Sequence, residues 1–150
     1  MKVVIQRVSQ ASVTIEEKIV ANIQHGLMIL VGIEDEDNDE DIDWLVNKTI
    51  NLRIFDDANH VMNLSVKDTN GDIIVVSQFT LHASTKNGNR PSYLKAAKPE
   101  VSIPMYESFV GALEVALGKK VQTGIFAADM KVALLNDGPV TIIIDSKNKE

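Results

Sequence analysis

The sequence contains no cysteine, and none of its apolar runs approaches the length of a membrane span. Without cysteine the chain has no disulfide, no thiol nucleophile and no thiolate metal site. A helix that crosses a membrane needs about 20 consecutive apolar residues, so no membrane partner is expected. Lys2 and Arg7 interrupt the first apolar residues, which is unlike a secretory signal peptide. We therefore expect a cytoplasmic protein.

Histidine is nearly as scarce, with three residues, His25, His60 and His82, that lie far apart in the chain. None of them has the HExxH type of spacing that binds zinc, so no metal site is expected. The acidic run at 34–41 lacks the glycine that an EF-hand loop needs for its turn. We interpret His82 as a surface or hydrogen-bonding residue rather than as a catalytic base.

The net charge of -6 provides no general basic surface for nucleic acid, and no DNA partner is expected. The charges are nevertheless unevenly distributed. The acidic run at 34–41 contrasts with Lys86, Arg90, Lys95 and Lys98, which occupy a segment without carboxylates. A basic patch of this kind can bind a phosphate backbone, although charge alone favours a solvated loop.

The length of 150 residues suits one domain spanning 1–150, large enough to bury a single core. Apolar residues alternate with period two, or run continuously, in four segments near the N-terminus, which predicts four strands. These strands are 3–8, 11–15, 18–23 and 26–33, with Glu16–Glu17 as a hairpin turn. We predict that they form a meander that closes into a barrel-like sheet.

Two amphipathic helices complete a predicted mixed α/β fold that is rich in antiparallel strands. Asn38 or Asp39 can cap a helix over 39–50, whose apolar residues recur at helical spacing. The acidic residues before it are interpreted as its solvated start, because carboxylates favour the positive end of the helix dipole. Ser102 can cap a second helix that ends at Gly118.

The last two predicted strands, 132–135 and 140–144, are joined by the short sequence Asn136-Asp137-Gly138-Pro139. These residue types favour a hairpin turn. The close approach of a ligand to the backbone is the alternative explanation, because glycine leaves space and proline fixes the direction of the carbonyls.

An apolar strand at 73–81 ends in the polar residues Ser77, Gln78 and Thr80. Buried polar groups need hydrogen-bond partners, so these side chains either bind the backbone of a neighbouring strand or face a ligand. The pattern alone favours the neighbouring strand. The segment 82–91 is small and polar, with a glycine and a proline, which predicts an exposed loop of the kind that often carries binding residues.

Three motifs together resemble the D-aminoacyl-tRNA deacylases, also called D-tyrosyl-tRNA deacylases. They are VSQFTL at 76–81, KNGNRPS at 86–92 and NDGPVT at 136–141, and the similarity extends through the whole chain. Ala127 stands where members of the family often have glycine, which should matter little. Asn87 and Asn89 replace residues that are often basic, which predicts weaker contacts with tRNA.

The resemblance implies the fold of that family and a hydrolase acting on a carboxylic ester. The ester links a D-amino acid, or glycine, to the 3′-terminal adenosine of tRNA. The family acts as a homodimer with its active sites at the interface, with aminoacylated tRNA as partner and without metal or cofactor. A Gly-cisPro pair of one subunit, here Gly138 and Pro139, reaches into the pocket of the other and rejects L-amino acids by steric exclusion.

The resemblance also implies roles for the residues of the SQFT motif. Thr80 positions the substrate, with a nucleophile as the minority alternative because the sequence shows no base that would activate it. Ser77 and Gln78 orient the adenosine or support the strand, and Phe79 stacks on the terminal base or belongs to the core. Backbone groups near them hold the developing oxyanion, and the 2′-OH of the terminal ribose helps to activate water. Met130 is assigned to substrate binding.

Lys86 and Arg90 are assigned to the phosphates of tRNA, a contribution that salt weakens. Two other functions stay open. One is hydrolysis of an L-aminoacyl-tRNA by a sister enzyme in which the Gly-Pro bond is trans. The other is a nucleic-acid-binding protein that has lost hydrolysis. A purely structural dimer scaffold would leave the SQFTL and GPVT motifs without a purpose.

Overall fold

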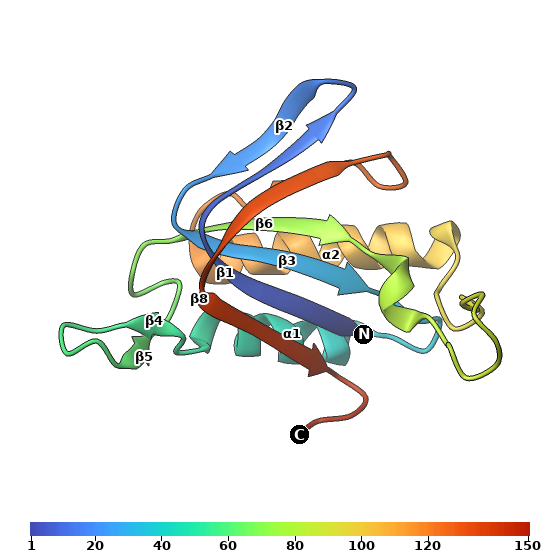
Figure 1. Ribbon diagram of the computed structural model, residues 1–150. Helices are drawn as coiled ribbons and strands as arrows, with labels where there is room; N and C mark the ends of the chain where they lie inside the picture. The colour runs from blue at the N-terminus through green and yellow to red at the C-terminus, as the bar shows by residue number, and fades with distance from the viewer.

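The computed structural model describes residues 1–150, and its centre is a strongly curved sheet (Figure 1). The strands run in the order β2-β1-β3-β6-β7, and β8 also pairs with β1. Their bounds are Lys2–Ile15 (β1), Lys18–Ile23 (β2), Gly26–Gly32 (β3), Asp72–Ser77 (β6), Gln122–Thr123 (β7) and Lys131–Asp145 (β8). A separate small sheet consists of β4, Phe55–Asp56, and β5, Met62–Leu64. None of the helices combines the length and the apolar character that a membrane crossing requires.

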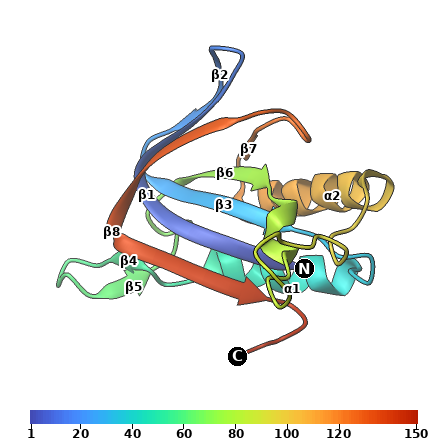
Figure 2. The same ribbon diagram turned by 45° about the vertical axis from the view of Figure 1, so that its right-hand side comes forward.

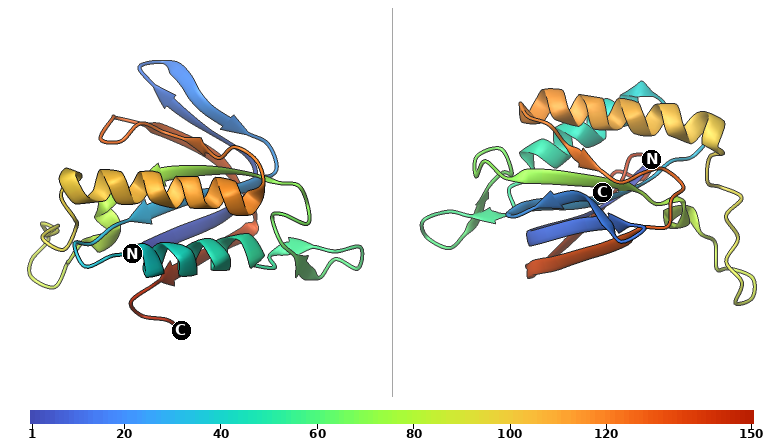
Figure 3. Two further views of the ribbon diagram at one scale, coloured as in Figure 1. Left: turned by 180° about the vertical axis from the view of Figure 1, so that it is seen from behind. Right: turned by 90° about the horizontal axis from the view of Figure 1, so that it is seen from above.

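Helices α1, Asp39–Asn51, and α2, Pro99–Leu117, lie side by side on one face of the sheet, as the view from behind shows (Figure 3). Their apolar stripes pack onto the sheet in a cluster of 22 buried residues that includes Phe109. A second cluster of 8 buried residues, with Met28 and Ile74 among them, lies within the curve of the sheet. The predicted mixed α/β fold with a barrel-like sheet and two helices is confirmed.

Strand β3 is central, as predicted, and it runs parallel to β6 with Val31 opposite Ser77. Both strands are buried on their two faces because the two clusters cover them from opposite sides. Since parallel strands end at the same edge of a sheet, the polar residues after Val76 emerge beside the end of β3. This edge carries the candidate functional site.

Strand β1 is one continuous strand of 14 residues, so the prediction of separate strands at 3–8 and 11–15 is wrong. Ser9 and Gln10 are exposed and interrupt the alternation, but the backbone continues because β1 pairs with β3 along its first half and with β2 along its second. The predicted meander is therefore also wrong, since β1 lies between β2 and β3. The Glu16–Glu17 turn is confirmed, with φ of 47° and 65°.

Helix α1 begins as predicted, after the cap residue Asn38. The Asn38 side chain accepts a hydrogen bond from the Glu40 N–H at 2.9 Å, and Asp41 Oδ2 accepts one from the Asn38 N–H at 3.0 Å. This reciprocal capping box satisfies two backbone donors that would otherwise have no partner at the start of the helix.

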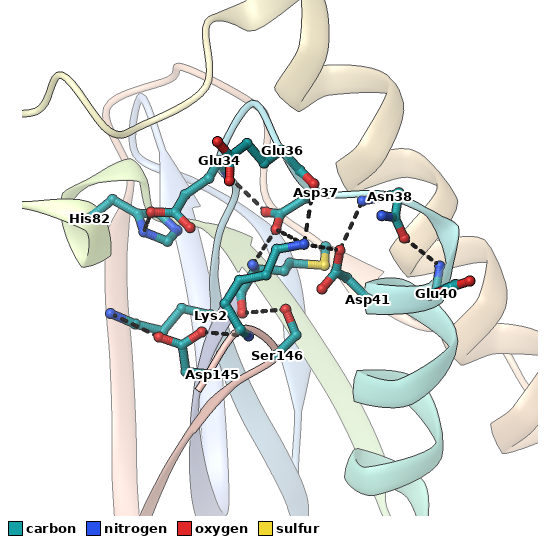
Figure 4. A network of polar contacts seen from close by, with 12 residues as sticks. Lys2, Glu34, Glu36, Asp37, Asn38, Glu40, Asp41, His82, Asp145 and Ser146 are labelled. Carbon is teal, nitrogen blue, oxygen red and sulfur yellow. Dashed lines mark hydrogen bonds and ion pairs between the residues drawn. The ribbon is translucent and has the colours of Figure 1, made fainter. Parts of the chain in front are cut away.

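The acidic run before α1 is only partly solvated, which corrects the prediction for this segment. Asp37 and Asp41 are buried. Asp37 pairs with the terminal ammonium of Met1, and Lys147 Nζ lies 2.7 Å from Asp41 Oδ2 (Figure 4). Burial by itself would raise the pKa of Asp41, but hydrogen bonds led by that from Lys147 lower it to about 2. The chain ends supply the opposite charges, a pairing that local sequence does not reveal.

Helix α2 begins at Pro99 rather than after Ser102, so the predicted cap is wrong. Proline at the first helical position has the backbone angle of a helix and no N–H to satisfy. The Ser102 hydroxyl instead donates to the carbonyl of Lys98 at 3.0 Å. The predicted end is confirmed, because Gly118 adopts a left-handed conformation with φ of 80° and its N–H donates to the Glu114 carbonyl.

The predicted hairpin at 136–139 is wrong, because β8 is a single strand that pairs with β1 on both sides of this segment. Asn136 is opposite Val8 and Thr141 is opposite Gln6. Four residues of β8, 137–140, therefore face the single residue Arg7, and they form a bulge instead of a turn. The turn-forming sequence changes the path of the strand locally while pairing with β1 continues.

Candidate functional site

The strand predicted at 73–81 ends earlier than predicted. β6 stops at Ser77, and residues Phe79–His82 form a short 3-10 helix, η1. The Gln78 N–H still donates to the Val31 carbonyl at 2.7 Å, and the Gln78 carbonyl accepts from the Leu81 N–H at 3.2 Å. The N–H groups of Phe79 and Thr80 stand at the start of this turn, so they have no acceptor within it.

The Gln78 side chain turns toward Thr80 instead of the backbone of a neighbouring strand. Its Nε2 donates to Thr80 Oγ1 at 2.6 Å. Because the hydroxyl accepts this bond, its own proton remains free to be donated to a ligand. An amide cannot act as a base, so the arrangement orients Thr80 without activating it as a nucleophile.

His82 lies two residues beyond Thr80 and contacts Glu34 instead of Thr80. The ring is 5% exposed, and its Nδ1 lies 3.2 Å from Glu34 Oε1 (Figure 4). This supports the interpretation of His82 as a hydrogen-bonding residue. Thr80 has no histidine or carboxylate among its hydrogen-bond partners.

A cavity of about 630 Å³ opens where β6 ends, between η1 and the start of α2. Its wall is mainly apolar, with a few polar groups, which is typical of a site for a small organic ligand. The lining residues are Val31, Ile33, Val76, Ser77, Gln78, Phe79, Tyr93, Ala96, Ala97, Lys98, Pro99, Ser102, Phe126, Ala127, Ala128, Asp129, Met130 and Val132.

Four of the predicted site residues meet at this cavity, namely Ser77, Gln78, Phe79 and Met130. Thr80 is bound to Gln78 but does not line the cavity wall. Lys86, Arg90, Gly138 and Pro139 are not part of the lining either.

Buried contacts hold the walls of the cavity in place. The Tyr106 hydroxyl of α2 donates to the carbonyl of Val75 in β6 at 2.8 Å, and burial raises the pKa of Tyr106 to about 12. The Ala97 N–H donates to the Ile33 carbonyl at 2.9 Å. Ala127, in the opposite wall, has φ of 63°, a conformation that glycine adopts more readily than alanine.

The basic segment 83–98 runs beside the cavity. The predicted exposed loop 82–91 is exposed from Ala83 to Arg90, whereas His82 belongs to η1 and is buried. Lys86 and Arg90 are exposed and take part in no ion pair, which leaves their charges available to a ligand. Tyr93 and Lys98 of the same segment line the cavity. Sequence reasoning missed Tyr93, although a tyrosine within a polar basic stretch is itself a signal of binding.

The bulge at Gly138 and Pro139 is exposed, and the peptide bond between them is cis. The Arg7 side chain on the facing strand β1 holds the bulge. Its Nε donates to the Asp137 carbonyl at 3.0 Å, and its Nη1 donates to the Ile54 carbonyl at 2.6 Å. The Asn136 amide donates to the carbonyls of Val140, at 2.9 Å, and of Arg7, at 3.2 Å.

A methyl group added at Gly138 would lie 2.8 Å from Val140 Cγ2 and 3.0 Å from Arg7 Nη2, so the bulge has no space for a side chain. Arg7 is 8% exposed and was also missed by sequence reasoning. The signal for it was an arginine within an otherwise apolar run of β1.

In the ribbon views, the bend in the middle of β8 lies at the opposite end of the sheet from the end of β6, where the cavity opens (Figures 1 and 2). Arg7, opposite the bulge, pairs with Leu27 of β3, which pairs with Ile73 of β6. Ser77, at the cavity, lies further along β6 than Ile73. The bulge and the cavity are therefore separated by about 13 Å along the strand direction and about 14 Å across the strands. In one chain, Gly138 and Pro139 therefore do not reach the cavity.

Comparison with known proteins gives consistent results. A family model described as D-Tyr-tRNA(Tyr) deacylase matches residues 4–145. A protein of Flavobacterium psychrophilum named D-aminoacyl-tRNA deacylase is 79% identical over 150 residues, which is 100% of both chains.

Two solved structures share the fold. One, called c-Myc DNA Unwinding Element Binding Protein, has a TM-score of 0.92 and 37% identity, covering 97% of this chain and 98% of that one. The other is described as a probable eukaryotic D-amino acid tRNA deacylase, with a TM-score of 0.82 and 18% identity over 95% of this chain and 97% of that one.

Proposed function

The chain belongs to the D-aminoacyl-tRNA deacylase family, hydrolases of the aminoacyl-tRNA ester bond, and from this premise we propose how its residues perform that reaction. The substrate is a D-amino acid, or glycine, esterified to the 3′-terminal adenosine of tRNA. The observation that carries the proposal is the SQFT turn at the edge of a cavity of about 630 Å³. This space suits a nucleoside, and its mainly apolar wall suits a base and an amino acid side chain.

The proposed chemistry places little demand on protein side chains. Thr80 has only the Gln78 amide as partner, so it positions the ester by donating its proton and does not attack. Water attacks the ester carbonyl with help from the 2′-OH of the terminal ribose. The N–H groups of Phe79 and Thr80 stabilise the oxyanion that develops on the carbonyl oxygen. The acyl bond to the ribose oxygen then breaks and releases the amino acid.

Rejection of L-amino acids is proposed to come from Gly138 and Pro139 of a second subunit. The separation of bulge and cavity within one chain supports a homodimer in which each bulge completes the cavity of the partner. Arg7 and Asn136 hold the bulge, so its carbonyls meet an L side chain as a fixed obstacle. A D side chain points elsewhere, and glycine has none. Selectivity arises because the wrong substrate is excluded.

The activity is tested by following D-tyrosyl-tRNA, L-tyrosyl-tRNA and glycyl-tRNA in parallel, with and without a chelator. Rapid loss of the D and glycyl esters, with the L ester stable and the chelator without effect, is the expected result. Decay of the L ester at a similar rate would favour the sister activity on L-aminoacyl-tRNA. An equal loss of all esters at the spontaneous rate would refute hydrolysis.

The composite site is tested by mixing two impaired variants. Thr80→Ala leaves the bulge intact, whereas Gly138→Ala leaves the turn intact. In a mixed dimer one of the two sites combines both intact halves. Exchange of subunits should therefore raise the activity of the mixture to about a quarter of wild type, above the mean of the two separate variants. If each chain completed its own site, the mixture would keep that mean.

A nucleic-acid-binding protein without hydrolysis is a second candidate, favoured by the name of the structural neighbour at 37% identity, which refers to a DNA unwinding element. The net charge of -6 and the single basic segment weigh against broad contact with duplex DNA. Titration with duplex DNA and with uncharged tRNA distinguishes the candidates, since the deacylase should prefer tRNA.

A further inference from the structure

Phe79 and Tyr93 form an exposed aromatic pair at the rim of the cavity. Their ring centroids are 5.0 Å apart and the ring planes cross at 76°, an edge-to-face contact. Both residues line the cavity, yet Phe79 is 55% exposed and Tyr93 is 40% exposed. Because one ring presents its edge to the other, aromatic surface remains free for a third planar group.

The backbone around Tyr93 is anchored on both sides. Ser84 and Ser92 exchange two backbone hydrogen bonds, of 2.8 and 2.9 Å, which close the exposed loop just before Tyr93. On the other side, the Ala96 N–H donates to the Tyr93 carbonyl at 3.0 Å, and the Ala97 N–H donates to the Ile33 carbonyl just after β3. The tyrosine is therefore held at the rim, which lowers the entropic cost of binding a ligand there.

Unpaired positive charge lies near Tyr93 in the sequence. Lys86, Arg90, Lys95 and Lys98 take part in no ion pair, and the segment contains no carboxylate that could neutralise them. Lys98 itself lines the cavity. Free aromatic surface next to unpaired cations is the combination that binds single-stranded nucleic acid, in which bases stack on rings and phosphates meet the cations.

We propose that Tyr93, supported by Phe79, stacks on the base of the nucleotide that precedes the terminal adenosine, while the nearby cations contact the adjoining phosphates. This inference rests on the proposed function, which places the adenosine in the cavity and so brings the preceding nucleotide to its rim. In tRNA this nucleotide is an unpaired cytidine, whose base has a face free to stack. The contact strengthens RNA binding and leaves the choice between D and L amino acids to the bulge.

Three D-tyrosyl esters of increasing length test the proposal: D-tyrosyl-adenosine, a D-tyrosyl-CCA trinucleotide and D-tyrosyl-tRNA. Tyr93→Ala should lower kcat/KM for the trinucleotide and tRNA on the order of tenfold more than it lowers kcat/KM for the adenosine ester. Tyr93→Phe should retain wild-type rates because the ring is kept. Leu94→Ala is the matched control, since Leu94 is 94% exposed but does not line the cavity.

A trinucleotide with an abasic site at the penultimate position sharpens the test. With this substrate, the kcat/KM of wild-type protein should fall by about as much as the kcat/KM of Tyr93→Ala falls with the normal trinucleotide. The variant acting on the abasic substrate should show little further loss of kcat/KM. Additive losses, or an equal loss on D-tyrosyl-adenosine, would overturn the proposal, because Tyr93 would then act on the adenosine or on the fold. If wild-type protein hydrolyses none of the three esters, the proposed function fails instead.

Discussion

The bulge at Gly138 and the turn at Thr80 belong to one proposed site, yet their polar groups are used in opposite ways. Around the bulge, Arg7 donates to two backbone carbonyls and Asn136 to two more. At Thr80, the hydrogen bond with Gln78 is the only one that the side chain makes. The neighbouring basic segment forms no ion pair.

This difference indicates two kinds of contribution to one reaction. A bulge whose polar groups are satisfied within the chain keeps its shape before any ligand arrives, so it acts as a fixed surface. A turn whose donors are free acts by binding the substrate. Changes at the bulge should therefore alter which esters fit and the stability of the fold, whereas changes at the turn should alter rate or affinity alone.

The largest effect is expected for Gly138→Ala. The added methyl group meets Val140 and Arg7 at 2.8 and 3.0 Å, and φ of 128° is unfavourable for alanine. Displacement of the fixed surface should lower kcat/KM for D-tyrosyl-tRNA by about a hundredfold. Gly111→Ala is the control, because a Cβ there meets nothing within 4 Å. Unchanged hydrolysis by Gly138→Ala would mean that the bulge has no part in the site.

Arg7→Ala tests whether the hydrogen bonds of Arg7 hold the bulge in its conformation. Removal of a buried guanidinium leaves the carbonyls of Asp137 and Ile54 without their donor and should destabilise the fold by about 2 kcal/mol. Activity on the D ester should fall on the order of tenfold, because the bulge is no longer held in place. Urea unfolding and the rate of ester loss measure the two effects. A loss of stability with full activity would separate Arg7 from the site.

Thr80→Ala should lower kcat for D-tyrosyl-tRNA on the order of tenfold and leave the unfolding transition nearly unchanged. The only hydrogen bond of the side chain is with Gln78, so little of the fold depends on it. Thr80→Ser keeps the hydroxyl and should retain most of the rate. If Thr80→Ala unfolds the protein, the residue is structural; if it abolishes all turnover above background, the nucleophile role returns.

Lys86→Ala combined with Arg90→Ala should raise KM for tRNA several-fold. The slope of log KM against log salt should flatten by about 0.7 for each phosphate that the variant no longer binds. Hydrolysis of D-tyrosyl-adenosine should stay the same, since neither Lys86 nor Arg90 lines the cavity. Lys18→Ala removes an exposed lysine on the β1–β2 hairpin and serves as the control. An equal change in that control would point to net charge rather than to a specific interaction.

The smallest effect on activity is expected for Lys147→Met, in the ion pairs near the chain ends. The pKa of Asp41 is lowered from 3.8 to about 2, so its pairing stabilises the fold fully above pH 4 and is lost as the pH falls toward 2. The variant should melt a few degrees below wild type at neutral pH, and the difference should vanish in acid. Equal melting temperatures at pH 7 would show that the pair contributes nothing.

Local patterns predicted the elements whose signals lie within a few residues. Asn38 and the acidic residues after it predicted the start of α1, and Gly118 predicted the end of α2. The Glu16–Glu17 turn and the buried strand β3 were also correct. In each case the deciding interaction, a cap, a turn or a periodic apolar face, is local in sequence.

The predictions that failed depended on distant partners. The sequence 136–139 is turn-forming, but pairing with β1 on both sides kept β8 continuous and made a bulge. Asp37 and Asp41 were predicted to be solvated, but in the structure they are paired with the terminal ammonium of Met1 and with Lys147. The site residues Tyr93 and Arg7 were missed for the same reason, because neither has a sequence neighbour that reveals what it contacts.

The sequence by itself determined the family of this protein, its fold class and the two motifs of its proposed site, because residue identity at specific positions carries that information directly. Only the tertiary structure decided that Thr80 is held by Gln78 without a base, that Arg7 supports the bulge, and that bulge and cavity lie far apart in one chain. The hydrogen bond between Gln78 and Thr80 depends on the geometry of the turn, which the residue pattern does not reveal. The other two facts depend on contacts between residues that are distant in sequence, and chain packing sets those contacts.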